Sequence, residues 1–186
     1  MGRQVRGTLF VDYVRMIRGN KSVDWEEYLE PEDFELIEAR IDPEGWYPME
    51  AFERLGVGIV REVARGQLAA VQMWGHFQVA SVCEAFPNLV ARGDPRETLM
   101  RFHALHKSFF DYDAVVVEEA LDDGARVHVQ YGMGEVAEEA ACHQTLGFFE
   151  QLVTQAGGRE VTAKLSARSW EGSDRTVLDL HWTPPG

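Results

Sequence analysis

Apolar residues recur at helical spacing through the first half of the chain. The pattern predicts a helix ending near Gly19, another from about Pro48 to Gly66, and a long one from Gln67 to Val90. Apolar side chains surround much of the long helix, so we expect it to lie at the centre of the molecule. Asp94-Pro95 then supplies an N-cap and a first-turn proline for a further helix.

After Tyr112 the apolar period changes from 3.6 to 2. Two alternating segments flank Asp122-Asp123-Gly124 and predict a β-hairpin. A helix follows over 135–156, and a second predicted hairpin covers 161–169 and 175–182. The expected architecture is therefore α+β, with a helical N-terminal half packed on a four-stranded antiparallel sheet in the order β-β-α-β-β.

Length and composition restrict the class of protein. The 186 residues fit one domain covering 1–186, and a 45% hydrophobic share with 11% aromatics predicts a substantial core. Eighteen Lys and Arg against 31 Asp and Glu give a net charge of −13, which disfavours binding to nucleic acid. The apolar stretches are too short to span a bilayer and no signal-type run opens the chain, so a cytoplasmic protein without a membrane span is expected.

One histidine falls within an apolar stripe. On the helix predicted from Pro95, the residues Leu99, Phe102, His106 and Phe109 share one side. An imidazole in such surroundings is either a hydrogen-bonded core group or a metal ligand facing a cavity. Both interpretations of His106 remain open from the residues alone.

Catalytic motifs are absent from the sequence. Neither Gly-x-Ser-x-Gly nor His-Glu-x-x-His occurs, and the cysteines Cys83 and Cys142 form no Cys-x-x-Cys pair. The sequence therefore favours a protein that is not an enzyme. An enzyme that uses Cys83, or His103 with His106, is the alternative.

Three short motifs resemble a known group of proteins. Gly7-Thr8-Leu9-Phe10, the segment Gly45–Phe52 and the closing Leu180-His181-Trp182 are similar to an uncharacterised family abundant in myxobacteria. That family looks like a branch of the superfamily of haem nitric-oxide/oxygen-binding (H-NOX) domains, vinyl-reductase-type ligand domains and Bet-type vesicle-tethering subunits. The resemblance implies an H-NOX-like fold with an apolar pocket between helices and sheet.

The resemblance also bears on a cofactor. Phe86-Pro87 and the helix carrying His106 resemble the H-NOX segment that leads to the proximal haem histidine, which implies His106 as the axial ligand. The run from Tyr131 to Glu135 resembles the Tyr-x-Ser-x-Arg motif that holds the haem propionates. Here Met133 replaces the Ser and Glu135 replaces the Arg, so the propionates would meet a carboxylate. Haem is thus left open as a cofactor.

These features predict a non-enzymatic sensory or interaction domain, with a haem-based gas sensor using His106 as the alternative. The main interpretation expects an interlayer pocket that binds an apolar small molecule or is filled by side chains. Other expected partners are a protein with basic patches or a second copy in a homodimer. The predicted lining consists of Trp74, Phe77, Phe102, His106, Phe109 and Phe149.

Overall fold

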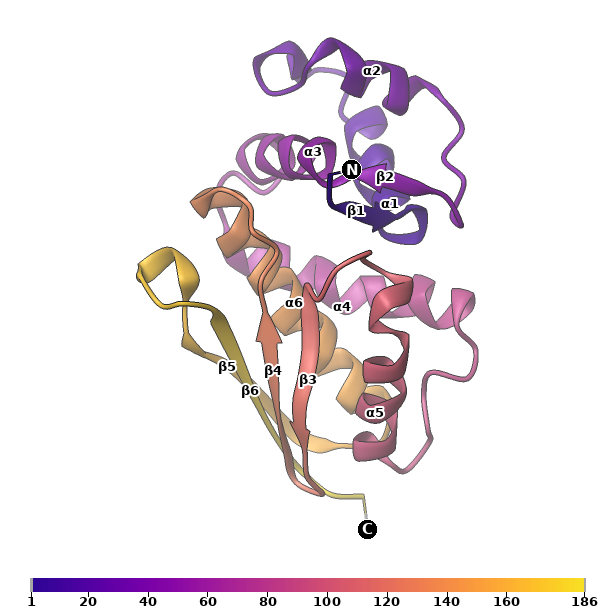
Figure 1. Ribbon diagram of the computed structural model, residues 1–186, viewed down its shortest axis with the longest axis vertical. Coiled ribbons are helices and arrows are strands. Elements are labelled where there is room, and N and C mark those ends of the chain that lie inside the picture. The colour runs from indigo at the N-terminus through magenta and orange to yellow at the C-terminus, as the bar shows by residue number, and fades with distance from the viewer. Residues whose placement is uncertain (1, 186) are drawn as a thin grey trace.

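The computed structural model describes residues 2–185, so the two ends of the predicted 1–186 domain lie outside the described residues. In Figure 1 the N-terminal elements lie above and the sheet lies below. The upper elements are β1 (Gln4–Arg6), α1 (Gly7–Gly19), α2 (Pro31–Glu38), β2 (Trp46–Pro48) and α3 (Met49–Glu62). The lower ones are α4 (Leu68–Ala85), α5 (Pro95–Leu105), β3 (Val115–Ala120), β4 (Gly124–Val129), α6 (Glu135–Gln155), β5 (Arg159–Ala167) and β6 (Thr176–Thr183).

The sheet has the strand order β3-β4-β6-β5, and every neighbouring pair is antiparallel. Val127 at its centre is paired with Val117 on one side and with Leu178 on the other. All three side chains are buried, because alternate residues of each strand face the helices. The predicted α+β fold with a four-stranded antiparallel sheet is confirmed.

Helix α6 lies behind the sheet and is buried almost all around. It contacts β5 and β6 on one side and α4 on the other, so it forms the middle layer of the molecule. The two helices cross at Gly75 of α4 and Gly147 of α6. A Cβ at Gly75 would lie 1.9 Å from the Gln144 carbonyl oxygen, so only glycine allows this approach.

The long helix α4 is central along only part of its surface. Val71, Val79 and Val82 are buried, but Phe77 is 70% exposed and Met73 is 48% exposed. Apolar residues surround the helix in sequence because one side packs on α6 while another apolar side faces solvent. The helix ends at Ala85, directly before Phe86-Pro87, and not at Val90.

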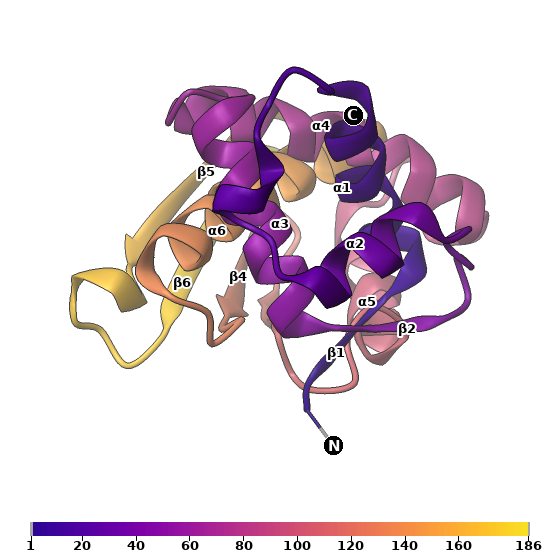
Figure 2. The ribbon, with the colours of Figure 1, turned by 90° about the horizontal axis from the view of Figure 1, so that it is seen from above.

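A two-stranded antiparallel ribbon joins the start of the chain to the segment before α3. Arg6 of β1 is paired with Trp46 of β2. An additional bridge from Val5 to Phe110 ties this ribbon to the segment that precedes the main sheet. Figure 2 shows β1 and β2 side by side, with α2 on the outer side of the N-terminal elements.

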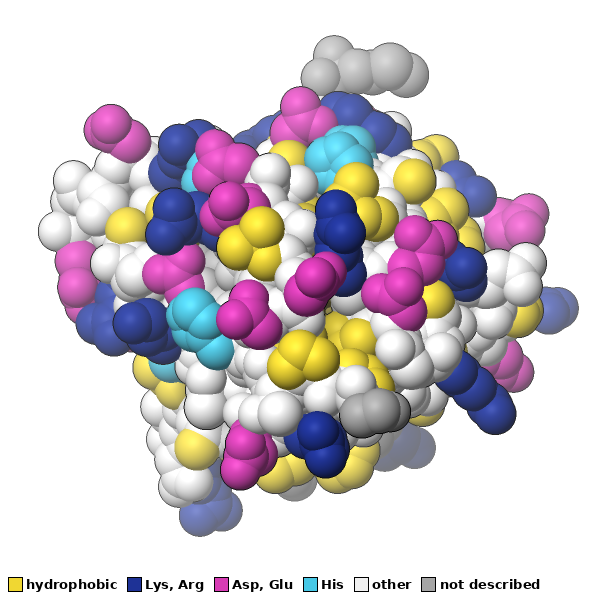
Figure 3. All heavy atoms as spheres, turned by 90° about the horizontal axis from the view of Figure 1, so that it is seen from below, with side chains coloured by type: hydrophobic (Ala, Val, Ile, Leu, Met, Phe, Trp, Pro, Cys, Tyr) yellow, Lys and Arg dark blue, Asp and Glu magenta, His cyan; other side chains and the backbone are white. Residues whose placement is uncertain are grey.

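Charges are mixed over the end of the molecule that carries the β3–β4 turn. In Figure 3, Lys and Arg side chains alternate with Asp and Glu, and hydrophobic side chains lie between them. This face offers no continuous basic surface for a phosphate backbone. Of the helices within residues 2–185, none is both long and apolar enough to cross a membrane.

Candidate functional site

Aromatic side chains fill the space between α5, α6 and the sheet. Phe102 of α5 stacks on Phe109, with ring centroids 5.5 Å apart and an interplanar angle of 14°. The edge of Phe149 meets the same ring at 4.9 Å, and Phe148 lies 5.7 Å away. All four rings are buried. The structure therefore brings together three predicted lining residues, Phe102, Phe109 and Phe149.

The cavity beside these rings is small. Its volume is about 50 Å³, and a neighbouring cavity closer to α3 measures about 30 Å³. For comparison, an apolar protein cavity of about 150 Å³ can bind one benzene molecule. The larger cavity is lined by Leu9, Gln78, Val82, Phe102, Phe109, Phe110, Val115, Tyr131, Thr145, Phe148 and Phe149.

Polar groups line one edge of the two cavities. The Tyr13 hydroxyl donates to Gln144 Oε1 at 2.8 Å, and Gln144 Nε2 donates to Gln78 Oε1 at 3.3 Å. The Tyr131 hydroxyl and Thr145 Oγ1 are 2.5 Å apart. Burial raises the pKa of both tyrosines, so both remain protonated hydrogen-bond donors at neutral pH. Sequence reasoning missed this network, although glutamines within the apolar pattern of two helices were a signal.

His106 lies outside these cavities. Helix α5 ends at Leu105, and His106 begins a short 3₁₀ turn, so its ring leaves the apolar stripe on which it was predicted. Its Nε2 lies 3.0 Å from Asp113 Oδ1, and its Nδ1 faces the His103 carbonyl oxygen. Hydrogen bonds from Lys107 and His106 lower the pKa of Asp113. Both imidazole nitrogens thus face protein acceptors, and neither directs a free lone pair into the interior.

The remaining candidates also lie away from the aromatic cluster. Trp74 is half-buried and Phe77 is exposed, and both line a groove between α1 and α4. His103 stacks on His106 at 5.3 Å, and its Nδ1 is buried with no partner among residues 2–185. Burial raises the pKa of the Cys83 thiol, which is the opposite of what an activated nucleophile needs. The structure therefore does not gather Cys83 and the two histidines with the aromatic rings.

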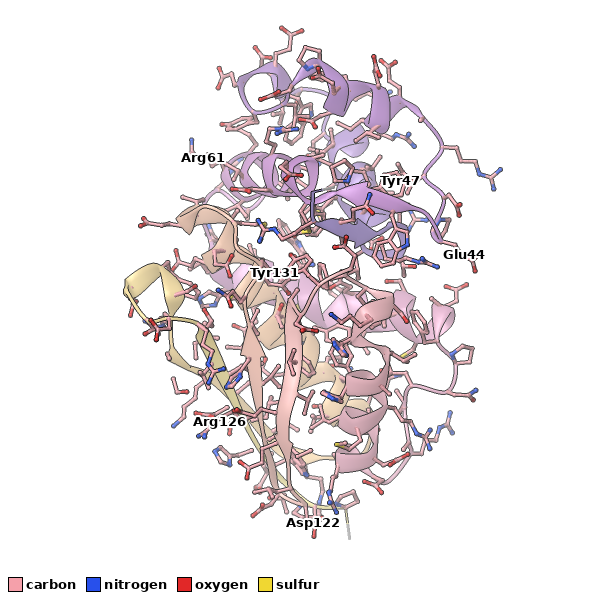
Figure 4. The ribbon with its side chains drawn as sticks, in the orientation of Figure 1. Glu44, Tyr47, Arg61, Asp122, Arg126 and Tyr131 are labelled. Carbon is pink, nitrogen blue, oxygen red and sulfur yellow. The ribbon has the colours of Figure 1, made fainter. Side chains whose placement is uncertain are left out.

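Carboxylates of the chain itself accept hydrogen bonds from the backbone of the run from Tyr131 to Glu135. Figure 4 shows Tyr131 where the N-terminal elements meet the sheet. Glu138, which is buried, accepts hydrogen bonds from the backbone N–H groups of Tyr131 and Met133, both at 2.9 Å. Glu53 accepts one from the N–H of Gly134 at 2.8 Å. Carboxylates of the chain thus already use three of the backbone donors that could hold an anionic ligand at this turn.

The residues present do not fit a haem. The aromatic rings leave a cavity far smaller than a macrocycle, the nitrogens of His106 face other acceptors, and carboxylates stand where propionates would lie. Two anionic propionates beside Glu138 would face like charge with little solvent to screen it. Among residues 2–185, no cluster of three or more His, Cys, Asp or Glu side chains could hold a metal ion.

Comparison with solved structures places the fold. An H-NOX protein from S. oneidensis in the Fe(II)NO ligation state superposes with a TM-score of 0.67 at 9% identity, covering 96% of this chain and 99% of that one. An oxygen-binding H-NOX domain related to soluble guanylate cyclases gives 0.62 at 12%, covering 97% and 96%. A mutant H-NOX from T. Tengcongensis gives 0.63 at 12%, covering 97% and 98%.

These likenesses extend over nearly the whole of each chain. The fold is therefore H-NOX-like, as the short motifs implied. No protein-family model matches the sequence, and no curated protein matches it.

Proposed function

We propose that this chain is a haem-independent interaction domain built on an H-NOX-like fold. The observation that carries the proposal is the closed aromatic cluster around Phe102, which leaves only about 50 Å³ where a ligand would lie. The position of His106, paired with Asp113 outside the cavity, supports it. The interior then acts as a core that holds the outer surfaces in place.

A non-catalytic role is part of this proposal. The titratable groups that line the two interior cavities among the described residues are tyrosines, and burial raises their pKa values. Such groups do not exchange protons readily near neutral pH. The sulfur of Cys83 is likewise held in its thiol form by burial.

A haem-based gas sensor is the second candidate. It is favoured by the comparisons, because the similar structures are H-NOX proteins in NO-ligated and oxygen-ligated states. On similarity alone these neighbours support haem more than they support an apolar ligand. The local geometry around Phe102, His106 and Glu138 supports the haem-independent proposal instead.

Titration with haemin distinguishes the two candidates. We expect haemin to give only a weak, broad absorption with the purified protein, without a narrow Soret band at one equivalent. We expect His106→Ala to leave this absorption unchanged. His103→Ala serves as the matched control at the neighbouring imidazole. A narrow band that saturates at one equivalent, is lost in His106→Ala and is kept in His103→Ala would support the gas sensor and reject the proposal.

A further inference from the structure

A groove runs between α1 and α4 on the surface of the molecule. The two helices are in contact, and α1 lies above α4 in Figure 1. The groove has a volume of about 540 Å³, roughly ten times that of the interior cavity. Its lining consists of Asp12, Met16, Trp74, Phe77, Gln78, Ala80, Ser81, Glu84 and Gln144.

Large apolar side chains in and beside this groove are exposed to solvent. Phe77 is 70% exposed, and Met73, one turn before it on α4, is 48% exposed. Met16 and Trp74 are half-buried beside them. Exposing this much aromatic and aliphatic surface to water is unfavourable, so a partner that covers Phe77 would gain hydrophobic free energy. Large apolar groups that gather at one surface site mark an interaction surface.

The charge of the groove is of one sign. Asp12 lies on the α1 side and Glu84 lies near the end of α4, while the described lining contains neither Lys nor Arg. Arg15, one turn along α1, pairs with Asp12 at 3.2 Å, and its side chain is 69% exposed. Burial raises the pKa of Asp12 despite this partner, so its carboxylate would gain from a second cation.

The length of the groove fits a short helix. Its α4 residues run from Trp74 to Glu84, which corresponds to roughly 15 Å along the helix axis at about 1.5 Å per residue. About three turns of a partner helix would lie along that distance. An apolar stripe on such a helix would contact Phe77 and Trp74, and basic residues beside the stripe would reach Asp12 and Glu84.

We propose that this groove binds a basic amphipathic helix from a partner protein. The inference rests on the proposed function as an interaction domain and names the partner's chemistry. A second copy of this chain fits less well, because each copy has a net charge of −13 and would bring its own carboxylates to the apolar face. The same charge disfavours nucleic acid as the partner.

Selection from a random helical-peptide display library tests the proposal. We expect enriched peptides to combine an apolar stripe with flanking Lys or Arg, and to lose at least about tenfold in affinity for Phe77→Ala. Glu84→Lys should weaken the same peptides by a similar factor through repulsion. Leu121→Ala, another exposed apolar residue, and Glu32→Lys, on the distant helix α2, are the matched controls and should bind normally.

Three outcomes would overturn the proposal: no enrichment, enriched peptides of acidic or neutral type, or equal binding by wild type and Phe77→Ala. Sedimentation analysis adds a fourth, a dimer that dissociates in Phe77→Ala, which would make the second copy the occupant. Haemin titration of the same preparations distinguishes failure of the groove proposal from failure of the proposed haem-independent function. If no peptide binds and no Soret band appears, only the groove proposal is rejected. A stoichiometric Soret band would instead reject the haem-independent function.

Discussion

Glu138 shows how a single residue organises the turn between sheet and helix. The residue is 4% exposed and lies in the first turn of α6, where the helix dipole favours negative charge. It accepts the N–H groups of Tyr131 and Met133, which otherwise would be unpaired where β4 leaves the sheet. Arg3 donates to the carbonyl oxygens of Tyr131 and Gly132, so the turn is held from both sides. The chain thus supplies its own anion at this turn.

Replacing this carboxylate should destabilise the fold. In Glu138→Gln an amide NH₂ would face one of the two backbone donors, and we expect a loss of about 1–3 kcal/mol in the free energy of unfolding. Urea denaturation measures the change. The control is Glu139→Gln, whose half-buried side chain follows directly in the sequence. Equal effects of both substitutions would show that Glu138 has no special place in the turn.

His143 makes stability depend on pH. Burial lowers its pKa below the ordinary value of 6.5, although Glu139 opposes the shift. The unfolded chain therefore takes up the proton first as pH falls through about 6.5, and folding stability is lost until the pH passes the lower pKa of the folded state. We expect His143→Gln to lose less stability than wild type between about pH 7.5 and 5.5.

Denaturation at both pH values tests this sign. His181→Gln, at an exposed histidine of β6, is the matched control and should follow the wild type. A steeper loss in His143→Gln than in wild type would reverse the assignment, because it would mean that the folded state binds the proton more readily.

At the scale of elements, the crossing of α4 and α6 determines how the middle layer fits together. A Cβ at Gly147 would lie 2.0 Å from the Gln72 carbonyl oxygen, which mirrors the contact made at Gly75. Both obstacles are backbone atoms and cannot move aside without shifting a helix. The two glycines therefore fix the distance between α4 and α6, and with it the position of the α4 face that carries Phe77.

Alanine at either glycine should separate the helices. We expect Gly75→Ala and Gly147→Ala each to cost about 3 kcal/mol of unfolding free energy, near the upper end for overpacking. Thermal denaturation measures this as a lower Tm. Gly19→Ala is the control, since a Cβ there meets nothing within 4 Å. An unchanged Tm in both crossing variants would contradict the close approach.

Elements were predictable from the sequence where the apolar pattern repeats over many residues, and less so where the element is only a few residues long. Both hairpins and α6 follow the predicted pattern because one buried face imposes a period on many residues. The β1–β2 ribbon was missed, since three-residue strands are too short for a period to show. His106 was placed on the apolar stripe because sequence spacing does not reveal that α5 ends at Leu105. Apolar residues occur on all sides of α4, so the sequence likewise did not show which side of this helix is buried and which is exposed.

At the scale of the whole molecule, the sequence led us to expect a pocket in the interior, but the structure has a larger opening at the surface. The predicted interlayer pocket is largely filled by phenylalanines, while a larger opening with an apolar part lies outside, between α1 and α4. A filled interior resists deformation because close-packed side chains have no room to rearrange. The rings around Phe102 therefore act as the rigid support for the surface that carries Phe77.

Opening the interior tests whether it is a core or a ligand site. Phe102→Ala removes the ring that contacts Phe109, Phe148 and Phe149, and should cost about 3–5 kcal/mol in unfolding free energy. Phe77→Ala is the matched control and should stay within about 0.5 kcal/mol of wild type, because its ring is exposed. We further expect benzene to raise the Tm of Phe102→Ala by filling the new space, and to leave the wild-type Tm unchanged. A comparable rise in wild type would mean that the native interior already admits an apolar molecule, and the rings would then line a ligand site instead of filling a core.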